Sequence, residues 1–385
     1  MKRGLTGHLE RVSTAGESFE AFVPSPLPPV PVLTIDADLQ ERLDQAHVAL
    51  GRLDSVTTLL PEKSIFLYSY VRKEAVLSSQ IEGTQSTLND LLLFEAQAAP
   101  GVPLDDVREV SRYVDALEQG MVRIRERFPL STRLFNEMHG LLLAEGRGAG
   151  KAPGEYRRSQ NWIGGARPSK ATYVPPPHTH VNQLMGALEN FLNDVPVRYP
   201  PLIKAALAHV QFETIHPYLD GNGRLGRLLV PLIFVREGIL AEPLLYVSLY
   251  IKRHRETYYE LLQQVREEGD WEEWLRFFAV AVESAARQAV ASVHALNGLG
   301  STDRARIRGL GRIASSCLQV YEAMFARPVA RIGHIAAITR QSNNTIVRML
   351  EHLQKLGIVE EVTGNKRNRV YRYPAYLEIL GREED

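Results

Sequence analysis

The fold can be inferred from one segment of the sequence, Leu202-Ile-Lys-Ala-Ala-Leu-Ala-His-Val-Gln-Phe-Glu-Thr-Ile-His-Pro-Tyr-Leu-Asp-Gly-Asn-Gly-Arg-Leu-Gly-Arg227. Its first part, up to Ile215, is mostly apolar and predicts a buried helix. Pro217 cannot continue that helix and restricts the residue before it, so His216 is predicted at a helix-to-loop junction. Gly221 and Gly223 permit a tight turn into a second helix. The sequence therefore predicts two helices joined by a loop that holds a histidine at its edge.

The same loop has the composition of an anion site. Its glycines let backbone N–H groups approach an anion, and the N-terminus of the following helix points at the same place. Arg224 and Arg227 lie on one helix face and can hold phosphate oxygens. Asp220 supplies a carboxylate suited to Mg²⁺ beside phosphates. We therefore predict a polyphosphate site in which His216 accepts the proton of an attacking hydroxyl.

The segment from His216 to Arg227 resembles the signature of the Fic family, in which His, Pro, an aromatic residue, any residue, Asp or Glu, and Gly-Asn-Gly-Arg-x-x-Arg follow in order. One position differs, because Tyr218 stands where the family usually has Phe. A capped helix with a surface Gly-Asn-Gly turn would explain the glycines, but not the histidine, the acid and the two arginines. The resemblance covers roughly residues 20–290 and implies a mainly α fold with a Fic-type helical core.

The resemblance also implies a role for each site residue. His216 would be the general base, Asp220 the Mg²⁺ ligand, and Asn222 and Gly223 contacts to the α-phosphate. The residues implied to bind ATP are Glu82, Gly221, Asn222, Gly223, Arg224, Arg227, Tyr250, His254 and Tyr258. His254 stands where an asparagine is common, and packing in an aromatic core accounts equally well for both tyrosines. The implied reaction moves AMP from ATP to a Ser, Thr or Tyr hydroxyl of a target protein or of the chain itself.

A second motif lies upstream, in a helix predicted over 63–82. Ser78 and Glu82 continue the packing face formed by Tyr68, Val71 and Ala75. A carboxylate on such a face needs a partner. Ser78-Ser-Gln-Ile-Glu82-Gly83 resembles the inhibitory motif of the family, which implies that Glu82 pairs with Arg227 in place of the γ-phosphate and could also orient a water that removes AMP. An ordinary helix end with a glycine stop is the alternative.

Residues 152–178 interrupt the helical pattern and predict a β-hairpin with a Gly/Pro/Ser tip. The hairpin resembles the flap of the family, which implies that Ile163, Gly164 and Gly165 align the target segment. Further helices are predicted from Asp38 to about Leu53, with Gly51 near its end, and over 86–97, 106–127, 131–144, 179–194, 200–215, 223–237, 252–268 and 270–297, with Ser86 and Ser131 as N-caps. The Pro-rich segment 23–32 predicts an extended arm wrapped on its own domain, a partner's groove being the alternative.

Small polar residues and glycines from Asn297 to Asp303 predict a break before a separate C-terminal domain. Helices over 317–325, 332–339 and 342–356, with strands over 358–363 and 369–373, follow in the order of a winged helix-turn-helix, an α+β module. Residues 303–385 hold 14 Lys and Arg against 9 Asp and Glu, and DNA could meet Arg340, Arg348, Lys366, Arg367 and Arg369. Contacts with protein are the equal alternative. The predicted domains are 1–125, 126–300 and 305–385.

Composition limits the remaining choices. Lys plus Arg and Asp plus Glu both number 45, so no global charge draws the chain to nucleic acid or to a membrane. The single Cys317 excludes an internal disulfide, and no run reaches the roughly 20 apolar residues of a membrane span, so we expect a cytoplasmic protein. A homodimer is possible. The competing functions are a nucleotide-sensing transcriptional regulator, an interaction protein, and a Fic enzyme that transfers UMP, phosphocholine or a phosphoryl group.

Overall fold

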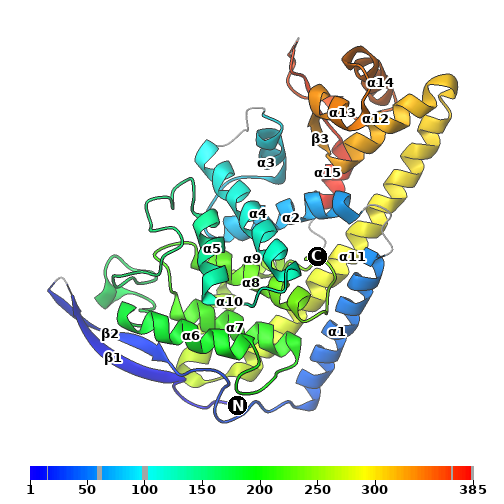
Figure 1. Ribbon diagram of the computed structural model, residues 1–385. Coiled ribbons are helices and arrows are strands. Elements are labelled where there is room, and N and C mark those ends of the chain that lie inside the picture. Colours follow the sequence, from blue (N-terminus) through cyan, green and yellow to red (C-terminus); the bar gives the residue numbers. More distant parts are fainter. Residues whose placement is uncertain (15, 59–62, 98–102, 366, 383–385) are drawn as a thin grey trace.

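The computed structural model describes residues 1–14, 16–58, 63–97, 103–365 and 367–382. Figure 1 shows a helical body, a β-hairpin at its lower edge, and a small domain at the far end of a long diagonal helix. The predicted mainly α fold is confirmed. Among the described residues, no helix combines the length and the apolar character needed to cross a bilayer.

The helices of the body are α1 (Ala37–Thr58), α2 (Lys63–Ile81), α3 (Leu88–Glu95), α4 (Leu104–Arg125), α5 (Thr132–Leu142), α6 (Val181–Leu192), α7 (Pro201–Ile215), α8 (Asn222–Arg236), α9 (Ser248–Arg253), α10 (Arg255–Glu268) and α11 (Trp271–Arg308). All the predicted helices are present, with several corrections. α1 continues past Gly51, and the helix predicted over 252–268 is divided at His254 into α9 and α10. Ser131 caps α5 as predicted, but α3 is capped by Thr87 and not by Ser86.

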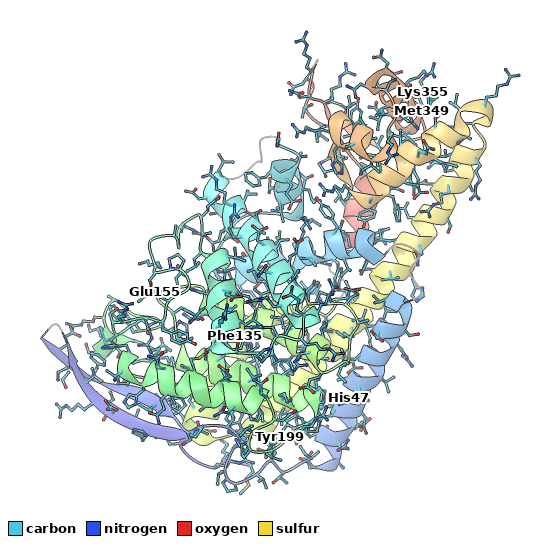
Figure 2. The ribbon with its side chains drawn as sticks, in the orientation of Figure 1. His47, Phe135, Glu155, Tyr199, Met349 and Lys355 are labelled. Atoms are coloured by element: carbon cyan, nitrogen blue, oxygen red, sulfur yellow. The ribbon has the colours of Figure 1, made fainter. Side chains whose placement is uncertain are left out.

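The central helix of the body is α7, in which every residue from Leu202 to Ile215 is buried. α8 returns beside it, and α6, α10 and α11 also pack against it. From α5, Phe135, which is labelled in Figure 2, meets Phe212 of α7 edge to face, with 6.3 Å between the ring centres. Because α7 and α8 are enclosed in this way, the loop between them is held at a fixed place.

The N-terminus forms a hairpin that the sequence did not predict. Strands β1 (Gly7–Thr14) and β2 (Glu17–Pro24) pair antiparallel along their whole length. The Phe22 N–H also donates to the Val174 carbonyl, so β2 is fixed by a segment distant in sequence. After the hairpin, Leu27 is buried and the Gln211 side chain donates to the Ser25 carbonyl. The proline-rich arm therefore lies on its own chain, as predicted.

The predicted break at 297–303 is wrong, because α11 passes through it without interruption. Leu296, Gly300 and Asp303 are buried in the helix, and Asp303 accepts a hydrogen bond from the Tyr373 hydroxyl. A glycine in a helix costs only about 1 kcal/mol relative to alanine, which such packing outweighs. The two glycines in this stretch therefore do not end the helix.

The C-terminal domain contains α12 (Ala314–Ala326), β3 (Val329–Arg331), α13 (Ile332–Thr339), α14 (Asn343–Lys355), β4 (Glu360–Glu361), β5 (Val370–Arg372) and α15 (Pro374–Gly381). The three predicted helices are present and both predicted strands are shorter, while β3 and α15 were not predicted. The sheet is antiparallel with the order β3-β5-β4. The winged-helix assignment and the three domain boundaries stay predictions, and Lys366 lies outside the described residues.

The C-terminal domain packs on the helices that precede the site. Leu92 and Ala96, at the end of α3, share a cluster with Val329 of β3 and Val370 of β5. The guanidinium of Arg327 also lies 5.0 Å from the ring centre of Tyr68 in α2. The two regions are therefore joined by apolar contact as well as by α11 (Figure 1).

Candidate active site

His216 ends α7, as predicted, and its backbone is left-handed with φ of 49°. This conformation is uncommon for a residue other than glycine, and here it turns the chain out of the helix. Arg157 stabilises the turn, because its Nε donates to the His216 carbonyl and its backbone N–H donates to the Pro217 carbonyl, both at 2.9 Å. The histidine is thus fixed at the edge of the loop.

Asn222 closes the loop from 216 to 223, which we call the His216 loop. Its side-chain Nδ2 donates to the Tyr218 carbonyl and its Oδ1 accepts from the Tyr218 N–H, both at 2.9 Å. The side chain is buried, so both of its polar groups serve the loop. Only the main chain of Asn222 remains for the predicted contact with an α-phosphate.

Tyr218 and His139 stabilise the loop through ring stacking and hydrogen bonds. The Tyr218 ring stacks on His139 with 3.7 Å between centroids, and its hydroxyl donates to Asn136 Oδ1 at 2.7 Å. His139 Nδ1 accepts a hydrogen bond from the Gly154 N–H, so the ring proton must be on Nε2. Nε2 then donates to the Asp220 carbonyl. Burial lowers the pKa of His139 to about 4, in agreement with this neutral form. The sequence analysis identified neither Asn136 nor His139.

The surroundings of His216 keep its imidazole neutral. Burial lowers its pKa to about 4, and the guanidinium groups of Arg157 and Arg266 act in the same direction. A neutral imidazole can accept a proton at physiological pH. The site therefore has a base in the required form without any further change.

Glu82 and Arg227 form the predicted ion pair. Arg227 Nη2 lies 2.7 Å from Glu82 Oε1, and Arg227 also donates to Ser78 through Nε at 2.8 Å and Nη2 at 3.0 Å. Burial acts to raise the pKa of Glu82, but Arg227 and then Arg224 outweigh it and lower the pKa below its ordinary value. A Cβ atom at Gly223 would lie 2.3 Å from Glu82 Oε1. The carboxylate therefore covers the first turn of α8, where an anion is favoured.

Arg224 and Asp220 form the other side of the anion site. Arg224 is buried, with Nη1 at 2.7 Å from Glu109 Oε1 and Nη2 at 3.4 Å from Asp220 Oδ1. The Asp220 side chain is 41% exposed and accepts from the Gly221 N–H at 2.6 Å. Among the described residues there is no group of three or more His, Cys, Asp or Glu side chains that could hold a metal ion. The sequence offered no signal for Glu109.

Glu213 is a further carboxyl group at this site that the sequence analysis did not single out. Its side chain passes over Gly226, where a Cβ atom would lie 2.3 Å from Glu213 Oε1. That oxygen is buried and has no hydrogen-bond partner among the described residues. Burial raises the pKa of Glu213 to about 7, with Arg227 opposing and Glu82 reinforcing the shift. The group is therefore poised between its neutral and charged forms near neutral pH.

The predicted aromatic residues are divided between core and surface. Tyr258 is buried and its hydroxyl bonds to His209 Nε2 at 2.9 Å, so it belongs to the core, as the alternative interpretation held. Tyr250 is partly buried, and its ring centre lies 4.3 Å from that of His254, where α9 and α10 meet. Tyr259 is 42% exposed, and the charge of Glu82 contributes to its raised pKa after burial. The sequence analysis did not single out Tyr259, whose ring packs edge to face against Tyr258.

The flap, residues 161–174, is less regular than the predicted β-hairpin. A single antiparallel bridge joins Ile163 to Tyr173, and Pro168–Lys170 form a short 3-10 turn between them. Gly164 and Gly165 have φ of 70° and 73°, a left-handed conformation that does not continue a strand. The Tyr173 hydroxyl donates to the Thr214 carbonyl at 2.6 Å. The flap is therefore attached to the last turn of α7, next to His216.

The chain matches two family models. Residues 40–122 match the model described as Fic/DOC family N-terminal, and residues 129–234 match the model described as Fic/DOC family. A protein adenylyltransferase Fic from Aedes aegypti is 29% identical over 264 residues, which cover 65% of this chain and 47% of the relative. A protein adenylyltransferase Fic from Drosophila erecta is 30% identical over 266 residues, which cover 64% of this chain and 48% of the relative. The chain thus spans about half the length of the curated relatives it matches.

Solved structures share the fold. A Fic family protein from Desulfovibrio desulfuricans has a TM-score of 0.58 at 21% identity, covering 89% of this chain and 97% of its own. A Fic domain containing signaling protein from Bacteroides thetaiotaomicron has a TM-score of 0.52 at 20% identity, and the match covers 67% of this chain and 95% of that protein. At these identities the likeness concerns the fold.

Proposed function

Because residues 40–122 and 129–234 of this chain belong to the Fic/DOC family, we propose that it transfers AMP from ATP to a protein hydroxyl, with His216 as the base. The observation that carries the proposal is a neutral, partly buried imidazole fixed beside the N-terminus of α8 and the two buried arginines Arg224 and Arg227. This set combines a base with an anion site. The adenylyltransferase names of the relatives favour AMP as the group that moves.

In the proposed reaction, a Ser, Thr or Tyr hydroxyl oxygen attacks the α-phosphorus of ATP. The hydroxyl proton passes to the imidazole of His216 as the new phosphate ester bond forms. The bond from the α-phosphorus to the bridging oxygen breaks, and pyrophosphate leaves with the electron pair of that bond. The main chain of Asn222 and Gly223 contacts the α-phosphate, and Arg224 and Arg227 hold the outer phosphates.

Asp220 is the residue that would hold Mg²⁺. Its carboxylate is 41% exposed and only its Oδ1 takes part in the contacts with Gly221 and Arg224. Mg²⁺ commonly takes one or two carboxylates and completes its shell with water and substrate phosphates, so a lone acid fits it. The bound ion would neutralise charge on the phosphates.

Glu82 would keep the resting protein weakly active. Its carboxylate is bound to Arg227 and lies over Gly223, so a γ-phosphate and Glu82 compete for one guanidinium. Removing the carboxylate therefore favours ATP bound with its α-phosphate in line for attack. The same group, which is 36% exposed, could orient a water that removes AMP from modified protein.

The partners follow from the same geometry. The target protein adds its acceptor segment along the flap at Ile163, Gly164 and Gly165, where recognition through the main chain leaves side-chain identity open. The C-terminal domain carries an excess of basic residues and offers a surface for DNA. A homodimer would provide a means of moving α2 with its Glu82.

The test is autolabelling with [α-³²P]ATP and Mg²⁺. We expect Glu82→Gly to label at least about fivefold more than the wild type, as a typical coupling between two competing ligands allows. His216→Ala in the Glu82→Gly background should lose at least about 100-fold, and the exposed His294→Gln serves as the matched control. Equal labelling of wild type and Glu82→Gly would falsify inhibition by Glu82. Mass spectrometry of the product separates AMP from UMP, phosphocholine and phosphate.

A further inference from the structure

Each arginine of the anion site is paired with a carboxylate from another helix. Glu82, directly after α2, pairs with Arg227 at 2.7 Å, and Glu109 of α4 pairs with Arg224 at 2.7 Å. The first pair is the one proposed to inhibit. The second pair raises the question of whether Glu109 also competes with ATP or instead prepares the site for it.

Glu109 is almost completely buried and lies against the loop that follows α5. Its side chain is 6% exposed, and that of Arg224 is 3% exposed. Its second oxygen, Oε2, lies 3.3 Å from the guanidinium of Arg147. A Cβ atom at Gly146 would lie 3.7 Å from the Glu109 Cβ, so the loop after α5 lies against this residue. With a side chain only 6% exposed, Glu109 has little free space into which it could move away from Arg224.

Glu82 occupies the opposite kind of position. It follows Ile81, the last residue of α2, and precedes Gly83, whose φ is 100°. Its side chain is 36% exposed. A rotation of the side chain or a small change at this helix end removes Glu82 from Arg227 without disturbing the core. The two pairs therefore differ in whether the carboxylate can be replaced.

The guanidinium of Arg224 lies between the carboxylates of Glu109 and Asp220. Its Nε and Nη1 atoms are buried and make no aligned hydrogen bond among the described residues, although Nη1 lies 2.7 Å from Glu109. The ion pair with Glu109 therefore compensates the charge of the buried guanidinium. A buried guanidinium with no carboxylate nearby would lose its fixed orientation or draw in water.

We propose that Glu109 is a positioning residue of the ATP site, which holds Arg224 in the orientation that phosphate oxygens require. The inference rests on the proposed function, and it assigns to Glu109 the opposite effect to that of Glu82. Loss of Glu82 strengthens ATP use, because a competitor is removed. Loss of Glu109 weakens ATP use, because Arg224 is no longer held.

The experiment compares variants of the full chain in the Glu82→Gly background, so that ATP can enter. We expect Glu109→Gln to raise the KM for ATP about tenfold while kcat changes less than about threefold, since the lost contact serves binding. Glu109→Asp keeps the charge but withdraws it by one methylene, and we expect a rise of about threefold in KM. Asp105→Asn, at an exposed position of the same helix, is the matched control and should leave KM unchanged.

Binding of ATP measured by calorimetry gives a second readout that does not need transfer. A tenfold weaker binding of ATP by Glu109→Gln supports the inference even if no acceptor protein is labelled. Absence of labelling would count only against the proposed transfer of AMP. An unchanged or tighter Kd and KM in both Glu109 variants would overturn it, and a tighter value would make Glu109 a second inhibitor. Should Glu109→Gln fail to fold by circular dichroism, Glu109→Asp carries the same test.

Discussion

The His216 loop and the flap meet at Tyr218, yet they are held in different ways. The loop is fixed by buried side chains, with Asn222 bonded to both polar groups of the Tyr218 backbone and His139 stacked below. The flap has one main-chain bridge of its own and exposes Trp162, Gly164 and Gly165. Besides the hydrogen bonds of Tyr173 and Val174 described above, it touches the loop through Asn161, whose Nδ2 donates to the Tyr218 carbonyl at 3.1 Å.

Because of this difference, one site can combine precisely placed reacting groups with tolerance of different protein acceptors. A base and a phosphate must be placed to within a fraction of an ångström, which requires side chains whose own positions are fixed by packing. An acceptor segment can instead be aligned by backbone hydrogen bonds, which any sequence supplies. We therefore expect changes in the loop to affect all reactions, and changes in the flap to affect protein acceptors.

The largest effect is expected for Asn222→Ala in the loop. The Tyr218 N–H and carbonyl would lose their side-chain partner, at a cost of about 1–3 kcal/mol in the free energy of unfolding. The displaced loop should lower autolabelling of Glu82→Gly about 100-fold, because small misplacements of reacting groups have such effects. Asn182→Ala, at an exposed position of α6, is the control. Labelling within threefold of the parent would mean that the loop is held by other contacts.

Burial of ionisable groups around the loop should also affect the pH dependence of stability. We expect the free energy of unfolding to be highest near pH 6 to 6.5. Burial raises the pKa of Glu74 to about 8 and that of Glu213 to about 7, so folding takes up protons as the pH falls from 8.5, and stability rises. Burial lowers the pKa of His139, His209 and His216 to about 4, so the unfolded chain binds more protons below pH 6.5, and stability falls.

Each unbalanced proton changes the free energy of unfolding by about 1.4 kcal/mol per pH unit. Urea titrations from pH 5 to pH 8.5 measure the curve. Glu74→Gln should remove much of the slope above pH 7, because that residue would no longer bind a proton on folding. A free energy of unfolding that rises steadily from pH 5 to pH 8.5 would contradict the expected protonation of these five groups.

The smallest effect is expected in the flap, for Gly165→Ala. The added Cβ atom would lie 2.2 Å from the Lys170 carbonyl oxygen at a φ of 73°, so the flap must shift. We expect labelling of proteins in a cell lysate by Glu82→Gly to fall about fivefold, consistent with local strain, while the KM for ATP is unchanged. Gly150→Ala has no neighbour within 4 Å and is the control. A raised KM for ATP would show that loop and flap are coupled.

The mispredicted segments of the fold share one physical cause. Asn297 to Asp303 has the composition of a break, but its glycines lie in a helix that is buried against α12 and α15. Conversely, residues 7–24 gave no clear strand signal, and pairing between the two strands together with the Phe22 to Val174 hydrogen bond forms the hairpin. Local propensity is worth tenths of a kcal/mol per residue, so tertiary contacts decide such segments.

The residues of the site also differ in whether the sequence or only the tertiary structure identified them. The residues from His216 to Arg227 could be identified from the sequence alone, because their chemistry lies in one contiguous motif. The pairing of Glu82 with Arg227, which are 145 positions apart, was implied only by the resemblance to the family's inhibitory motif. Only the tertiary structure brought Glu109, Glu213 and His139 to these residues, since each comes from a different helix and carries no motif of its own. The tertiary structure also decided that Tyr258 belongs to the core, because helical spacing defines a face but not what covers it.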